Sequence, residues 1–121
     1  MKRIKVVLVE PGKKARVTEI DRSLECMQKL VGGYIERFIL DDEVCIICNE
    51  EGKIEGLPLN RAIFYEGELI EIIAGTFFIC ADPWDSEHFE SLTDEQAKEF
   101  SEMFMAPEYF VRTAQGIAVV K

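Results

Sequence analysis

Val44–Asn49, which reads VCIICN, is the strongest structural signal in the sequence. Its five apolar residues lead into the polar segment Asn49–Lys53, and an apolar run of this length beside a turn signal is typical of a strand buried on both faces. Residues three apart in a strand point to opposite faces, so Cys45 and Cys48 are poorly placed to share a metal or to act as a redox pair. We therefore predict that both are small buried hydrophobic residues.

Strand patterns also precede this segment. The Val- and Ile-rich run Ile4–Val9 predicts a buried first strand. A Pro-Gly turn follows it, and Ala15–Ile20 is predicted to form its hairpin partner, with Val17 and Ile20 facing inward. A further strand is predicted over Tyr34–Leu40, directly before the apolar run.

Two segments carry the periodicity of amphipathic helices. The first has Asp21 or Ser23 as its N-cap and ends at a Gly-Gly pair, and the second begins with the capping-box pair Thr93 and Gln96. The apolar stripes predicted to face the core are Leu24, Met27, Leu30 and Val31 in the first helix and Ala97, Phe100, Met103 and Phe104 in the second.

The segments after the apolar run contain three further signals. We expect Gly52 to take a positive φ in the turn that follows the run. Ile70–Ala81 predicts a strong strand interrupted at Gly75, where a bulge or a close backbone approach is expected. The tail ends in the apolar stretch Ile117–Val120, which suits an edge strand or a short docking segment.

The order of these elements is strands, helix, strands, helix. Without strict alternation of strand and helix, this order favours an α+β fold with a mainly antiparallel sheet and two principal helices packed on one of its faces. The length of 121 residues fits a single domain over residues 1–121, with a core at 1–104 and a C-terminal tail at 105–121.

The net charge of −9 is distributed unevenly. Residues 1–40 carry a formal charge of +4 and residues 41–121 a charge of −13. Such an acidic chain is not expected to bind nucleic acid directly. The carboxylates either keep the protein soluble or meet a basic protein surface, including one that normally holds DNA. No membrane-spanning run or signal peptide is recognisable, so a cytoplasmic location is expected.

No catalytic or metal-binding motif is present, and we predict no catalytic residues, no metal and no cofactor. His88 lies in a polar loop without a second metal ligand nearby in the sequence. A ligand-binding site is predicted around Asn60-Arg61 and Gly75-Thr76, with Lys53 and Tyr34 as further members. Arg61 is expected either to be paired within the structure or to be presented to an anionic ligand.

Several motifs in this order resemble a known family. The chain is similar over residues about 4–100 to the family called domain of unknown function 3846, whose members are typically encoded by phages, prophages and plasmids. No catalytic residues are assigned in that family. The motifs that carry the resemblance are Val9–Gly12, Gln28–Glu36, Cys48–Lys53, Gly56–Arg61, Ile73–Phe78 and Ser91–Gln96.

This resemblance favours a non-enzymatic binding module of a mobile element that acts on a host defence or regulatory component. One version captures a small nucleotide-like ligand through Arg61, Lys53 and Tyr34. A second version is an acidic protein that binds a host protein or mimics DNA, as antirestriction inhibitors do. The alternatives are a homo-oligomer assembled through the apolar tail and a small enzyme.

The enzyme alternative has a structural requirement. It needs a cleft that joins Asn60, Arg61 and Thr76 to Glu50 or Glu51.

Overall fold

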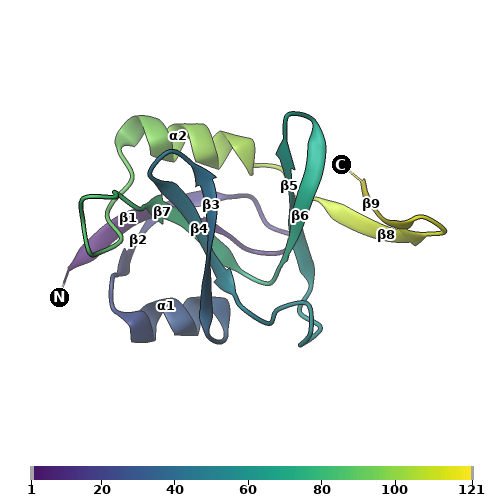
Figure 1. Ribbon diagram of the computed structural model, residues 1–121, viewed down its shortest axis with the longest axis horizontal. Helices are drawn as coiled ribbons and strands as arrows, with labels where there is room; N and C mark the ends of the chain where they lie inside the picture. The colour runs from purple at the N-terminus through teal and green to yellow at the C-terminus, as the bar shows by residue number, and fades with distance from the viewer. Residues whose placement is uncertain (1, 121) are drawn as a thin grey trace.

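Strand β4 (Val44–Asn49) lies inside a five-stranded antiparallel sheet, as its apolar sequence predicts. The structure is a computed structural model that describes residues 2–120. The strands are arranged in the order β2, β1, β7, β4, β3 (Figure 1). The bounds of the other four are β1 Arg3–Val9, β2 Arg16–Asp21, β3 Ile35–Asp41 and β7 Phe77–Ala81.

The two helices lie on opposite faces of this sheet, whereas the sequence had suggested one face (Figure 1). Helix α1 (Leu24–Val31) packs on the face that holds Cys45, and helix α2 (Asp94–Met103) packs on the face that holds Cys48. The physical reason is that β4 is apolar on both faces, so each face needs its own cover. The α+β class with a mainly antiparallel sheet is confirmed.

The helix caps agree with the sequence patterns. Ser23 accepts a hydrogen bond from the Cys26 N–H at the start of α1, and Gly32 ends that helix with a φ of 82°. Thr93 and Gln96 form the predicted capping box of α2. Neither helix within residues 2–120 is long and apolar enough to cross a membrane.

Three side chains predicted to face the core are exposed instead. Leu24 and Met103 lie in the end turns of their helices, and Val17 lies on the edge strand β2. On the same stripes Met27, Val31, Ala97, Phe100 and Phe104 are buried and Leu30 is half-buried. Leu24 is the first residue of α1, before the turns that the sheet covers, and Met103 lies at the margin of the stripe centred on Phe100 and Phe104.

The second sheet is the hairpin of β5 (Leu59–Tyr65) and β6 (Glu68–Ala74). It packs its Ile63 and Ile73 into the core on the α2 side of the large sheet. The predicted strand over 70–81 is therefore two strands in different sheets. Gly75, with a φ of 82°, lies where the chain leaves β6 before entering β7.

The tail forms a third sheet, a hairpin of β8 (Tyr109–Thr113) and β9 (Gly116–Val120). It projects from the body next to the β5–β6 hairpin (Figure 1). The predicted strand at 117–120 is present, paired with a partner strand that the sequence patterns did not indicate.

Candidate functional site

Asn49, at the end of β4, anchors the loop that leads to β5. Its side chain is buried and donates hydrogen bonds to the Val31 carbonyl at 3.1 Å and to Glu55 Oε1 at 3.2 Å. Its Oδ1 accepts a hydrogen bond from the Glu51 N–H at 2.7 Å. The Asn49 side chain thus links the end of helix α1 to Glu51 and Glu55, and these hydrogen bonds hold the loop in a defined position.

Gly52 is required in this loop for its size and not for its conformation. A Cβ atom at this position would lie 2.8 Å from the Ala74 carbonyl oxygen, because the loop passes directly against the end of β6. The expected positive φ at Gly52 is wrong. Gly56 takes the left-handed conformation, with a φ of 74°.

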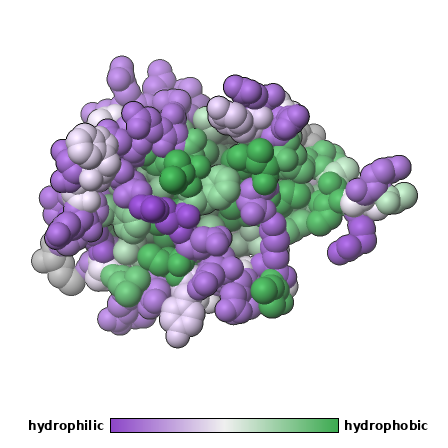
Figure 2. Space-filling view, viewed as in Figure 1, coloured by the Kyte–Doolittle hydropathy of each residue, from purple (hydrophilic) through white to green (hydrophobic). Residues whose placement is uncertain are grey.

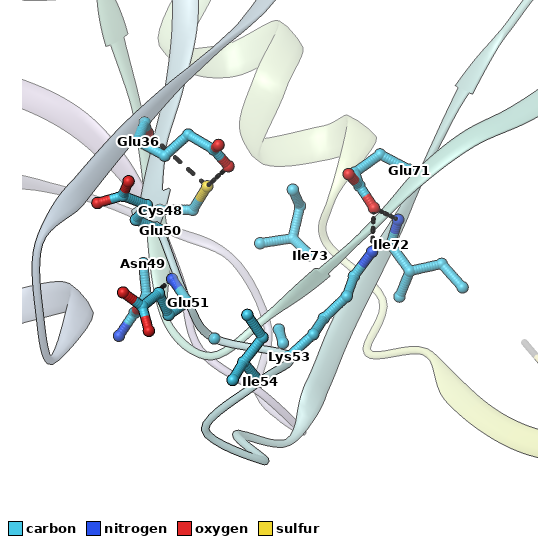
Figure 3. A pocket seen from close by; sticks show the side chains of 12 residues that line it. Glu36, Cys48, Asn49, Glu50, Glu51, Lys53, Ile54, Glu71, Ile72 and Ile73 are labelled. Atoms are coloured by element: carbon cyan, nitrogen blue, oxygen red, sulfur yellow. Dashed lines mark hydrogen bonds and ion pairs between the residues drawn. The ribbon is translucent and has the colours of Figure 1, made fainter.

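Two clefts lie on either side of the Asn49–Glu51 segment. The first, of about 290 Å³, separates β4 from β6 and is lined by Glu36, Cys48, Lys53 and Glu71 among others (Figure 3). The second, of about 280 Å³, is lined by Gln28, Gly33, Tyr34, Glu55 and the same Asn49–Glu51 segment. We call these two the acidic clefts, because their linings together hold five carboxylates and one ammonium group.

Lys53 is the one cation of the acidic clefts, and it is already paired with Glu71 (Figure 3). Burial opposes ionisation of Glu71, but the hydrogen bonds from Lys53 and the Ile72 N–H, with the Lys53 charge, hold its pKa below the ordinary value. No Lys or Arg among residues 2–120 forms an ion pair with the other four carboxylates, Glu36, Glu50, Glu51 and Glu55. The clefts therefore keep an uncompensated negative charge.

Cys48 lies in the first cleft with its thiol directed at Glu36. Burial raises the pKa of this thiol to about 12, and the negative charges of Glu36 and Glu71 add to the effect. The Sγ atom donates to the Glu36 carbonyl at 3.7 Å and to its Oε1 at 3.9 Å. Since only a thiolate is a good nucleophile, Cys48 is inert at neutral pH. Within the described residues, no group of three His, Cys, Asp or Glu side chains is placed to hold a metal ion.

Arg61 is fully buried, and its hydrogen bonds are made within the protein. The guanidinium donates to the Phe104 carbonyl at 2.9 and 3.2 Å and to the Lys13 carbonyl at 2.6 Å. It also donates to the Asn60 carbonyl at 3.2 Å and to Asn60 Oδ1 at 2.8 Å. Burial lowers the pKa of Arg61, an effect that Glu108 and Tyr109 partly offset. Arg61 was expected either to be paired within the structure or to be presented to an anionic ligand, and these contacts match the first role.

Four of the six residues of the predicted ligand site lie together, namely Asn60, Arg61, Gly75 and Thr76, whereas Lys53 and Tyr34 lie elsewhere. Asn60 is fully buried and donates to the Gly75 carbonyl at 2.8 Å, beside Arg61. Thr76 is half-buried in a shallow depression near Gly75, Lys53 lies in the first acidic cleft, and Tyr34 lies in the second. Asn60 and Arg61 line none of the five main cavities of residues 2–120, and Thr76 lines one that includes neither Glu50 nor Glu51.

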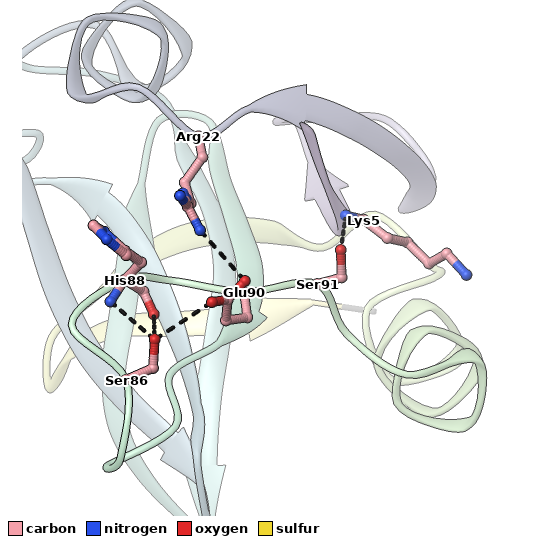
Figure 4. Close-up of polar contacts among 6 residues, drawn as sticks. All are labelled: Lys5, Arg22, Ser86, His88, Glu90 and Ser91. Carbon is pink, nitrogen blue, oxygen red and sulfur yellow. Dashed lines mark hydrogen bonds and ion pairs between the residues drawn. The ribbon is translucent and has the colours of Figure 1, made fainter. Parts of the chain in front are cut away.

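Ser86, His88 and Glu90 lie close together in the loop before α2 and are residue types of hydrolytic triads (Figure 4). The contacts between Ser86 and His88 use the backbone N–H and carbonyl of the histidine, at 3.1 and 3.2 Å. The imidazole ring points away from Ser86, and Glu90 is paired with Arg22 at 3.4 Å (Figure 4). Ser86 Oγ also donates to Glu90 Oε2 at 3.4 Å. This group therefore stabilises the loop, and the Ser86 hydroxyl makes no hydrogen bond to the His88 ring that a hydrolytic triad requires.

The sequence reasoning missed Glu36, Glu55 and Glu71 as members of the clefts. They lie on β3, in the loop and on β6, so only the approach of the two sheets brings them together. The repeated carboxylates around Lys53 were a usable signal, but so acidic a chain offers many such groups.

A family model described as Domain of unknown function (DUF3846) matches residues 4–105. No curated protein and no solved structure matches the chain.

Proposed function

Because the chain belongs to the family described as Domain of unknown function (DUF3846), a description that assigns no activity, we propose its function from the site itself. The protein is a non-enzymatic binding module whose acidic clefts receive a cationic segment of another protein. The observation that carries this proposal is the set of four carboxylates, Glu36, Glu50, Glu51 and Glu55, held around two adjoining clefts without a cationic partner in residues 2–120.

The shape of the site supports an extended ligand with several charges. The two clefts share the Asn49–Glu51 segment as a common wall, so a ligand that crosses this wall meets carboxylates on both sides. A segment with several lysine or arginine side chains has the charge to do so. Complementary charges of this kind steer association and select the partner.

Tyr34 supplies a second kind of contact. Its side chain is 72% exposed, and it lines the second cleft together with Glu50, Glu51 and Glu55. An aromatic face beside carboxylates suits a guanidinium or ammonium group, which is attracted to the ring as well as to the negative charges. Tyr34 was expected to contact a ligand, and this proposal retains it for a cationic one.

Capture of an anionic nucleotide has less support from the geometry. Arg61 has no exposed surface, and Lys53 is neutralised by Glu71. A catalytic role also has little support, because Cys48 is held protonated and the His88 ring does not contact Ser86. The family resemblance implies a mobile-element setting, which favours a basic host protein of defence or regulation as the partner.

The proposal is tested by fluorescence anisotropy with a labelled oligoarginine peptide. We expect binding that weakens as salt is added, because salt screens surface charges. The Debye length is about 8–10 Å at roughly 0.1–0.15 M salt. The double variant Glu50→Gln/Glu51→Gln is expected to weaken binding by roughly tenfold, if each lost charge contact contributes up to about 1 kcal/mol.

The matched control is Glu99→Gln/Glu102→Gln, which changes the net charge equally at two exposed positions of α2. This control should bind nearly as well as the wild-type protein. An equal loss in the two double variants, or no peptide binding at low salt, would contradict the proposal.

A further inference from the structure

In the described chain, the β8–β9 hairpin has an unpaired outer edge along β9 and an uncovered apolar face. Within residues 2–120, β9 pairs with β8 on one side and with no strand on the other. An open strand edge presents unpaired N–H and C=O groups, and natural proteins protect such edges with charges, prolines or bulges. Strand β9, which reads GIAVV, has none of these protections.

The strand register shows which face of the hairpin is open. Arg112 and Ile117 are opposite each other and border a groove with Leu57 and Ile72, so this face is directed at the body. The opposite face carries Tyr109, Val111, Ala118 and Val120, and its three large side chains are 44–60% exposed. Figure 2 shows apolar residues extending from the β5–β6 side toward the start of β8.

A two-stranded hairpin is marginally stable on its own, whereas three or more strands with an apolar face are stable. We propose that β9 pairs with β9 of a second copy of this chain, antiparallel about a twofold axis near Ala118. The hairpins then form one four-stranded sheet in the order β8, β9, β9, β8. A symmetric contact of this kind closes on itself and gives a dimer.

The distribution of charge supports a second copy as the occupant. Two molecules with a net charge of −9 repel each other over most of their surfaces. Between Tyr109 and Val120 the only charged side chain is Arg112, which lies at the groove on the other face. The hairpin is thus a place where two copies meet without bringing carboxylates together.

The size of this contact sets the expected strength. Two five-residue strands and their side chains make an interface at the small end of the observed range, below roughly 1,200 Å². We therefore expect a dimer that dissociates on dilution. This inference does not rest on the acidic clefts, which involve other residues.

The test measures mass in solution by sedimentation equilibrium for the full chain. The wild-type protein should show a concentration-dependent mass approaching that of a dimer. Ala118→Glu and Ala118→Lys should each weaken the dimer by about tenfold or more, because like charges directly opposite in a sheet are destabilising. A mixture of the two variants should restore the dimer, since opposite charges then face each other across the axis.

The control is Gln115→Glu, which adds one negative charge at the hairpin turn, away from the strand edge. It should leave the dimer unchanged, and circular dichroism should show that all variants are folded. A wild-type protein that stays monomeric at every concentration would overturn the proposal. Two charged variants that dimerise like the wild-type protein, or a mixture that gives no recovery, would do the same.

Discussion

Arg61, which the sequence suggested as a ligand contact, makes its hydrogen bonds inside the protein. Its guanidinium joins the turn after β1, the end of α2 and strand β5 through carbonyl groups of Lys13, Phe104 and Asn60. The planar fork of arginine satisfies three such acceptors at once, which a lysine cannot do with the same geometry. Phe104 is 43 residues from Arg61 in the sequence and Lys13 is 48 residues away, so no local pattern could reveal this arrangement.

At this scale we predict that Arg61→Met lowers the free energy of unfolding by about 3 kcal/mol or more, because it leaves buried carbonyl groups without their charged donor. Urea denaturation followed by circular dichroism measures the change. Arg16→Met is the matched control, since Arg16 is exposed and its surface pairing with Glu10 contributes only about 0–1 kcal/mol. Equal losses in the two variants would show that the buried contacts contribute little.

Gly75 controls how two elements are joined. It has a φ of 82°, which glycine adopts readily, and a Cβ atom there would lie 2.7 Å from Leu57 Cδ1. A residue that tolerates a positive φ and has no Cβ atom therefore lets the chain leave β6 in the small sheet and continue into β7 in the large one. The sequence correctly marked an interruption at Gly75, but the interruption separates two sheets and is not a bulge within one strand.

At the scale of elements we predict that Gly75→Ala costs more stability than Gly12→Ala. Both glycines have a similar positive φ, so each alanine carries a conformational cost of roughly 1–2 kcal/mol. A Cβ atom at Gly12 meets nothing within 4 Å, whereas at Gly75 it also displaces Leu57. Thermal and urea unfolding of the two variants measure the difference. Equal costs would mean that Leu57 moves aside freely.

The whole molecule presents two separate surfaces. The first acidic cleft lies between β4 and β6, and the second lies between the loop after β4 and the turn after α1. The open edge of β9 belongs to the projecting hairpin of the tail. Glu36 and four carboxylates after residue 40 supply the first surface, and the uncharged strand GIAVV supplies the second. The acidity is therefore not uniform over the fold.

At this scale we predict that the two surfaces act independently. Ala118→Glu should bind the oligoarginine peptide within about twofold of the wild-type affinity, because Ala118 lines neither acidic cleft and changes at independent sites are nearly additive. Glu50→Gln/Glu51→Gln should keep the wild-type dimerisation constant in sedimentation. Loss of peptide binding in the Ala118 variant would show that the dimer completes the clefts and that the surfaces are coupled.

Local patterns in the sequence were sufficient to predict most elements and their ends. The apolar run of β4, the capping box at Thr93 and the glycine that ends α1 depend on neighbours along the chain, so they can be recognised without the fold. The opposite orientation of Cys45 and Cys48 also follows from strand geometry alone.

The order of strands and the composition of the site depend on the tertiary arrangement. Strand β7 lies between β1 and β4, and that placement brings together segments that are far apart in the sequence. The partners of Arg61 and the meeting of Glu36 with Glu71 across a cleft follow from the same packing. Such contacts are set by which sheets and helices cover one another, and local periodicity carries no information about that choice.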